Sequence, residues 1–225
     1  MRMIQLLGFH KESPDLELSP AEAEQRRRIF WTAFLLDTTS SIKAKQHPAL
    51  ELDNIQVHLP DENLLRGVRD LNSTHAVDNI KIFKLRVQLA IIESRVHRHL
   101  LNRTYDRVQG MSTINEISQL RDELTAWRDA VPPAVRPEYH LHPNPASLSS
   151  SVTALHLAYY DCVGMIRAAA ELYNSEEIRI SNIAQHLPSP AMDRLGFFTD
   201  NCARAARATL AMTPCLETLP LVEIW

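Results

Sequence analysis

Glycine is scarce in this sequence, with only 5 among 225 residues. Neither a Walker loop nor a G-x-G-x-x-G phosphate-binding turn is present, and the G-x-S-x-G motif that presents a nucleophilic serine is absent as well. Serine, aspartate and histidine are plentiful, but they do not occur at the spacings of a catalytic set. We therefore expect no enzyme.

Cysteine is also rare, and the three cysteines form no C-x-x-C pair. An odd number of scattered cysteines without a signal peptide is typical of a reducing compartment, where Cys162, Cys202 and Cys215 serve as small apolar residues. No uninterrupted apolar run approaches the roughly 18 residues that a membrane span requires. The expected protein is intracellular, soluble and without a membrane partner.

An excess of basic charge is missing too. The 24 Lys and Arg residues face 27 Asp and Glu residues, which gives a formal net charge of −3. The chain as a whole therefore has no attraction for phosphate backbones, and any contact with nucleic acid must be local. Hydrophobic residues make up 45% of the sequence, as in ordinary globular proteins, and the length suits one large domain or two small ones.

Helical signals dominate what is present. Ser19, Pro20 and Glu22 form a capping box with proline in the first turn, which predicts a helix start. In the helix that follows, Phe34 and Asp37 share one face, with Trp31 beside them. A charge on an apolar stripe must be hydrogen-bonded, so we expect Asp37 to act as a buried polar anchor rather than as a catalytic group.

Further helical patterns follow, and no convincing alternation of a strand appears. We expect helices over about 73–102, from the Thr113–Glu116 capping box to Pro132, over about 149–173 and 176–186, and over 191–211 after Pro190. The Pro/Ser-rich stretch near 132–150 is predicted to be a connector. The fold class is all-α, an irregular multi-helix bundle.

The arginine run (Arg26, Arg27 and Arg28) admits two interpretations. One is a DNA-binding patch, and the other is the solvated border of a packed helix with local carboxylate partners. The second is favoured, because Glu22 precedes Arg26 and Glu24 precedes Arg28 by one helical turn. Readers of the major groove also need several basic residues on one exposed face.

Two histidine pairs raise the question of a metal site. His140 and His142 lack a carboxylate or cysteine at a suitable spacing, and a zinc site needs about four ligands. His97 and His99 are two residues apart on a predicted helix, so they point to different faces and are interpreted as surface residues. We expect no metal and no cofactor in this chain.

A family resemblance rests on "LGFHKESPDLELSPAEAEQRRRIFWTAFLLD" followed by "LDNIQVHLP". These stretches resemble the middle homology region of fungal zinc-cluster transcription factors. In that family an LGLHR phrase precedes a Glu-Arg-Arg helix with a tryptophan and Leu-Asp, then a Gly-Arg-Pro turn and an acidic stretch ending in Leu-Pro. The resemblance assigns structural motif roles to Gly8, His10, Glu24, Arg26, Arg27, Arg28, Trp31, Asp37, Pro48, Asp53 and Pro60.

Three departures from the family pattern accompany the resemblance. Thr38 stands where the family has an arginine after Leu-Asp, so Asp37 needs another partner, and Gln46 to Pro48 replace the Gly-Arg-Pro turn. The family's six-cysteine module, which holds two zinc ions and reads DNA, is absent. We therefore expect residues 1–225 to be a partial, N-terminally truncated domain, with apolar surface exposed near Ile4 and over Leu219–Trp225.

The resemblance implies a nuclear regulatory domain that controls transcription through protein partners or a small-molecule effector. DNA would be contacted, and zinc held, only by the missing module. The alternative is a stand-alone helical protein that binds a partner or ligand and modulates a regulator without touching DNA. A six-cysteine cluster encoded in frame upstream of Met1 would distinguish the first from the second.

Overall fold

The computed structural model describes residues 2–12, 18–61, 74–101, 107–137, 149–184 and 202–213. Within these ranges the regular elements are helices. One isolated parallel β-bridge pairs Lys11 with Gln56. The predicted all-α class is therefore confirmed. The chain divides into two compact units, Met1–Ser94 and Arg95–Trp225, and the boundary falls within a helix.

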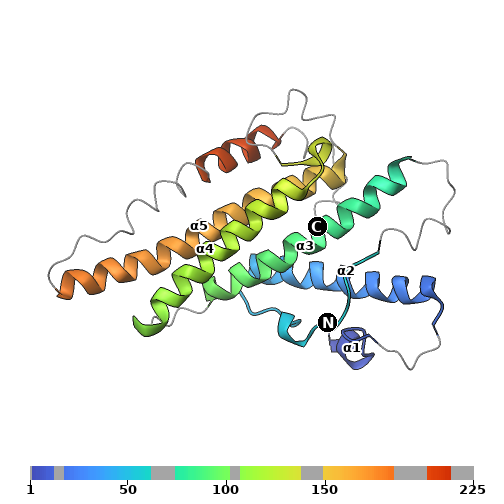
Figure 1. Cartoon of the computed structure of the whole chain (residues 1–225), viewed down its shortest axis with the longest axis horizontal. Helices are drawn as coiled ribbons and strands as arrows, with labels where there is room; N and C mark the ends of the chain where they lie inside the picture. The colour runs from blue at the N-terminus through green and yellow to red at the C-terminus, as the bar shows by residue number, and fades with distance from the viewer. Residues whose placement is uncertain are drawn as a thin grey trace. The chain divides into compact units, whose positions relative to one another are not determined.

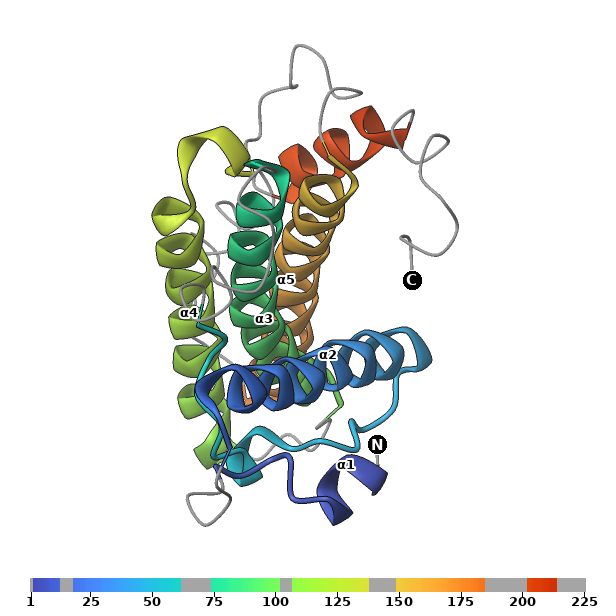
Figure 2. The same cartoon turned by 90° about the vertical axis from the view of Figure 1, so that its right-hand side faces the viewer.

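The first unit is built around helix α2 (Pro20–Ala44), which follows the short α1 (Arg2–Leu6). The predicted capping box is present: the Ser19 hydroxyl accepts from Glu22 N, and Ser19 N donates to the Glu22 carboxylate at 2.9 Å. The helix ends at Lys45, which adopts a left-handed conformation and donates to Ile42 O. Both views show the chain after α2 returning along that helix through η1 (Leu52–Asn54) (Figures 1 and 2).

The core of the first unit joins α2 to this returning chain and to helix α3 (Thr74–Leu101). The bounds of α3 agree with the helix predicted over 73–102. The buried core residues come from all three parts: Phe30, Trp31, Phe34, Leu50, Val87 and Ala90. Ile4 of α1 packs against this cluster as a half-buried residue, whereas Met3 and Leu6 are exposed.

The second unit contains helix α4 (Arg107–Ala130), which ends before the proline pair as predicted. Its predicted start was wrong, because Thr113 lies inside the helix rather than at its cap. The Thr113–Glu116 signature only marks a start when the preceding residues cannot be helical, and nothing between Arg107 and Thr113 breaks a helix outright. A 3-10 turn, η2 (Pro133–Val135), follows α4.

Helix α5 (Ser150–Ala184) is one element where two were predicted. Asn174 and Ser175 are only weak helix formers, and without a proline or glycine between the two patterns the helix continues. The helices α4 and α5 lie alongside each other (Figure 1), and the rings of Trp127 and Tyr159 stack between them at 5.9 Å.

The remaining predicted elements are covered only in part. Residues 202–211 are helical, as expected for the end of the last predicted helix, whereas residues 185–201 lie outside the described residues. The same holds for residues 138–148 of the predicted connector and for Leu219–Trp225. Among the helices that the structure describes, none combines the length and apolarity needed to cross a bilayer.

Candidate functional site

The centre of the motif region is the carboxylate of Glu24, which is fully buried on α2. It accepts from Arg27 Nη1 at 2.6 Å and from Arg28 Nε at 3.2 Å. Each of its two oxygens also lies 3.2 Å from the backbone N of Asp61, which donates to them. A buried charge is tolerated only when it is paired and hydrogen-bonded, and Glu24 meets both conditions.

Trp31 lies two turns further along α2 and is almost entirely buried. Its indole Nε1 donates to the carbonyl oxygen of His58 at 2.8 Å. Its ring meets Phe30 and Phe34 edge to face at centroid distances of 5.2 and 5.4 Å. The predicted burial of Trp31 and Phe34 is confirmed.

Asp37 occupies the same helix nearer its C-terminal end and is 8% exposed. Its Oδ2 accepts from the backbone N of Leu50 at 2.8 Å, so the predicted polar anchor is confirmed and its partner is a main-chain amide. Thr38, at the position of the family's arginine, is buried, and its Oγ1 has no hydrogen-bond partner among the described residues. The departure from the family pattern therefore leaves an unsatisfied hydroxyl, while Asp37 itself is satisfied.

These three side chains hold one continuous stretch, residues 48–61, which we call the return segment. Glu24 binds its last residue, Trp31 binds three residues earlier at His58 and Asp37 binds near its start, so the segment runs antiparallel to α2. The 13 residues from Glu24 to Asp37 cover about 20 Å of helix. The segment satisfies some of its backbone groups in the η1 turn and in the pairing of Gln56 with the chain after α1. The α2 side chains supply partners for three further groups, the N–H groups of Leu50 and Asp61 and the carbonyl oxygen of His58.

Arg26 faces a different part of the chain from its two neighbours. Its Nη2 donates to Leu7 O at 3.1 Å, and its guanidinium carbon lies 4.3 Å from the centroid of the Phe9 ring. The predicted pair with Glu22 is therefore wrong, because the Glu22 carboxylate is engaged at the cap by Ser19. Gly8 supplies the positive φ of 67° that turns the chain between Leu7 and Phe9.

The prediction that the arginine run is solvated is also wrong, because its side chains are less exposed than expected. The side chains of Arg27 and Arg28 are only 14% and 23% exposed, since Glu24 draws both inward. Arg28 additionally lies over the ring of Phe83, 5.4 Å from its centroid. The run is thus half-buried in the first unit, which favours a structural role over an exposed basic patch.

An ion network extends from Arg27 to Glu12 and His58. Glu12 Oε1 lies 3.3 Å from Arg27 Nη2 and accepts from His58 N at 3.1 Å, with His58 Nδ1 at 2.9 Å. Burial alone would raise the pKa of the Glu12 carboxyl, but the hydrogen bonds from His58 and the charge of Arg27 outweigh it and lower that pKa. Desolvation likewise opposes the charge of Arg27, yet Glu24 and Glu12 raise the pKa of its guanidinium.

The other motif residues lie at the margins of this arrangement. Pro60 is buried directly before Asp61, Pro48 is half-buried at the start of the return segment, and Asp53 is exposed in η1. His10 is half-buried, and its Nδ1 has no hydrogen-bond partner within the part of the chain that the structure describes. The resemblance therefore points to residues of two kinds: anchors that contact the return segment, and residues that shape the chain around them.

Sequence reasoning missed Glu12, His58 and Asp61, because no short spacing links them to α2. It also misplaced His97, which was interpreted as a surface residue but is 4% exposed. His99 is half-buried, with Nε2 3.6 Å from Glu116; burial lowers the pKa of its imidazole, and Glu116 only partly opposes this. His140 and His142 lie outside the described residues, within which no cluster of three potential metal ligands occurs.

Residues 1–129, which contain the whole of this arrangement, match the family model described as the fungal specific transcription factor domain. The chain belongs to this family. The resemblance stated from the motif residues is thereby confirmed, and the matched range extends through the return segment, α3 and most of α4.

Relatives of known class agree with the family. The chain is 28% identical to an ABC-transporter-regulating transcription factor of Aspergillus fumigatus and 29% identical to one of Aspergillus oryzae, over 100% of its own length and 25% of theirs. It is 26% identical to the Fusaridione A cluster transcription factor of Fusarium heterosporum, over 95% of this chain and 38% of that protein. The chain thus spans about a quarter of the length of the first two relatives. No solved structure matches it.

Proposed function

We propose that this chain is a regulatory domain that controls transcription in the nucleus through a small-molecule effector or protein partner. DNA is contacted by a zinc-cluster module outside this chain, and the domain itself has no enzymatic activity. The observation that carries the proposal is the match of residues 1–129 to the fungal specific transcription factor domain. The named roles of the relatives differ, one concerning ABC transporters and another a biosynthetic cluster, so the proposal is confined to transcriptional regulation.

The intramolecular contacts of the arginine run support the proposal that a separate module, and not this domain, binds DNA. Arg27 and Arg28 are committed to Glu24, and Arg26 to Leu7 and Phe9. Contact with phosphates would require these guanidinium groups to leave half-buried positions and would strand the buried Glu24 charge. The formal net charge of −3 provides no compensating attraction.

The test is a reporter assay in a fungal cell, with the chain fused to a heterologous DNA-binding domain and an activation domain. We expect the chain to change reporter output when it is inserted between these two modules, compared with a flexible linker of equal length. An output identical to that of the linker would contradict a regulatory role. Nuclear accumulation is measured separately, with a fluorescent fusion of the full-length gene product.

A gel shift with the purified chain tests the division of labour directly. The chain alone is expected to bind duplex DNA no more tightly than a neutral protein does, and to purify without stoichiometric zinc. A salt-sensitive, sequence-selective shift by this chain, or two bound zinc ions, would contradict the proposal. The alternative of a stand-alone modulator predicts instead a complete transcript that encodes no six-cysteine cluster before Met1.

A further inference from the structure

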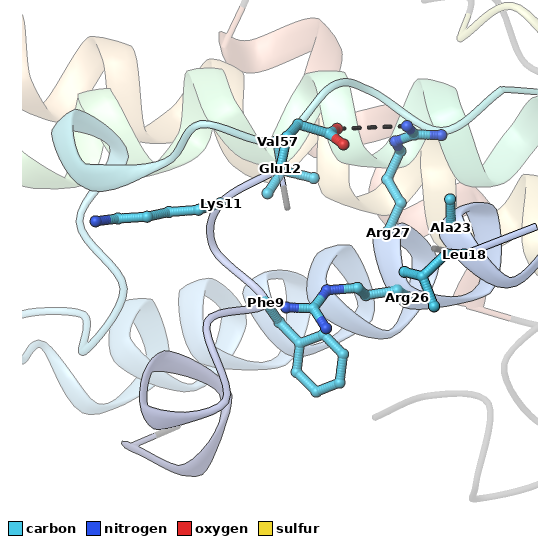
Figure 3. Close-up of a pocket in the computed structure, with 8 residues that line it drawn as sticks. All are labelled: Phe9, Lys11, Glu12, Leu18, Ala23, Arg26, Arg27 and Val57. Carbon is cyan, nitrogen blue, oxygen red and sulfur yellow. Dashed lines mark hydrogen bonds and ion pairs between the residues drawn. The ribbon is translucent and has the colours of Figure 1, made fainter. Parts of the chain in front are cut away.

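A small pocket opens between the start of α2 and the chain that follows α1 (Figure 3). Its volume is about 190 Å³, and one part of its wall is apolar, formed by Phe9, Leu18 and Val57. The other part is charged: in Figure 3 Arg26 and Arg27 extend into it from α2, whereas the Lys11 side chain points away from them at the rim. A pocket with apolar walls and a few placed charges is the usual form of a small-molecule site.

The charges of the pocket do not balance. Arg27 is neutralised by Glu12 and Glu24, and the contact with Glu12 is drawn in Figure 3. Arg26 and Lys11, in contrast, have no ion pair with any carboxylate in the part of the chain that the structure describes. Among the described residues that line the pocket, Arg26 therefore contributes a positive charge that no carboxylate pairs with.

The guanidinium of Arg26 is held in a fixed orientation by two contacts. Its guanidinium lies over the Phe9 ring at 4.3 Å, and the hydrogen bond from Nη2 to Leu7 O fixes its orientation. Its Nε is buried and has no acceptor among the residues that the structure describes, so a ligand in the pocket can be bound only through the outer nitrogens of the guanidinium. Guanidinium groups bind carboxylates with charge-assisted hydrogen bonds, which are stronger than neutral ones.

The size of the pocket limits the ligand. An engineered apolar cavity of about 150 Å³ in another protein accommodates benzene, so 190 Å³ leaves room for one ring and one small polar group. We propose that this pocket binds a small organic monocarboxylate with a single ring. The carboxylate lies at Arg26, and the ring packs against Phe9, Leu18 and Val57. The role of this pocket as the effector site of the domain rests on the proposed function, whereas the binding of the ligand does not depend on it.

Binding is tested on the purified chain by NMR titration with phenylacetate. Three comparison ligands separate the contributions: phenylacetamide keeps the ring without the charge, acetate keeps the charge without the ring, and sulfate is a generic anion. Phenylacetate should bind at least about tenfold more tightly than each of the three, because it alone contacts both the charged part and the apolar part of the pocket wall. Equal affinity for phenylacetamide, acetate or sulfate would overturn the proposal.

Variants locate the site. Arg26→Gln should weaken phenylacetate binding by at least about tenfold, whereas Lys45→Gln, which removes a positive charge at the other end of α2, should leave it unchanged. Val57→Phe fills the apolar part of the pocket and should abolish binding even if Arg26→Gln fails to fold. Binding that survives both Arg26→Gln and Val57→Phe in folded protein would overturn the proposal.

The reporter assay then separates the site from its role. If phenylacetate binds the purified chain but does not change the reporter output of the fusion, the site stands and its effector role fails. If the output changes and Val57→Phe removes the response, both stand. If the fusion regulates the reporter but the purified chain does not bind phenylacetate, the pocket proposal fails while the proposed function is unaffected.

Discussion

The indole Nε1 of Trp31 donates to the carbonyl oxygen of His58 at 2.8 Å, across 27 residues of sequence. The bond joins the buried face of α2 to the second half of the return segment. Glu24 and Asp37, one on each side of Trp31 along the helix, make further hydrogen bonds to the same segment. Helix α2 therefore holds residues 48–61 in place. Three of the predicted motif residues, Glu24, Trp31 and Asp37, are thus anchors for a largely irregular segment of the first unit.

Replacing Trp31 by alanine should destabilise the protein by about 3–5 kcal/mol, through lost burial and the cavity that remains. Arg26→Ala removes a half-buried contact with Phe9 and should cost only about 0.5–1 kcal/mol. The free energies of unfolding of both variants are compared by urea denaturation. A larger loss from Arg26→Ala than from Trp31→Ala would mean that the arginine has a structural role beyond the contacts described.

Asp37 should show the signature of a buried hydrogen-bond acceptor. Asp37→Ala leaves the backbone N–H of Leu50 without a partner and should cost about 1–3 kcal/mol. Asp37→Asn retains an acceptor oxygen of the same reach and should recover most of that loss. Thermal and urea unfolding of the two variants provide the comparison, and equal destabilisation by Ala and Asn would show that the negative charge, rather than the hydrogen bond, is what matters.

The network around Glu12 should make stability depend on acidity. The pKa of this carboxyl lies below its ordinary value of 4.5, so its contribution is complete above pH 4.5 and is lost as the pH falls below it. Glu12→Gln should therefore be less stable than the native chain at pH 7, by less than about 1 kcal/mol because the group is partly exposed. The difference should shrink by pH 4.

Urea unfolding at pH 7, 5 and 4 measures this dependence, with Glu51→Gln as an exposed control on the return segment. The difference between native chain and Glu51→Gln should stay nearly constant over the range. A Glu12→Gln difference that is the same at pH 4 as at pH 7 would show that Glu12 gains nothing from its folded surroundings.

The features predicted well from sequence are those that depend on neighbours in the chain. The Ser19 cap, the buried face of α2 and the end of α4 before Pro132 all follow from residues within one or two helical turns. The Thr113–Glu116 signature misled for the same reason, since a local capping pattern does not exclude a helix that has already begun. The two helices predicted around residue 175 merged because nothing local forces a break.

The features missed depend on contacts that close only in the folded chain. Glu24 was expected to pair with Arg28 on the surface, and that pair forms. The carboxylate is nevertheless buried, because Asp61, 37 residues away in sequence, packs against it and donates its backbone N–H. The exposure of the arginine run was overestimated because it depends on that burial. His97 was misplaced similarly, since its spacing to His99 excludes a shared face but does not say which face is covered.

Glu24→Gln tests most directly whether the arginine run is part of the fold. The substitution is nearly isosteric, but it leaves Arg27 and Arg28 half-buried without their shared counter-charge, and breaking a buried pair costs about 3–5 kcal/mol. Glu22→Gln is the matched control, because it changes an exposed carboxylate two residues earlier on the same helix, where glutamine can still serve the capping box. The measurement is the free energy of unfolding in urea at pH 7 for the native chain and both variants. The account predicts a large loss for Glu24→Gln and a small one for Glu22→Gln, and equal effects of the two substitutions would contradict it.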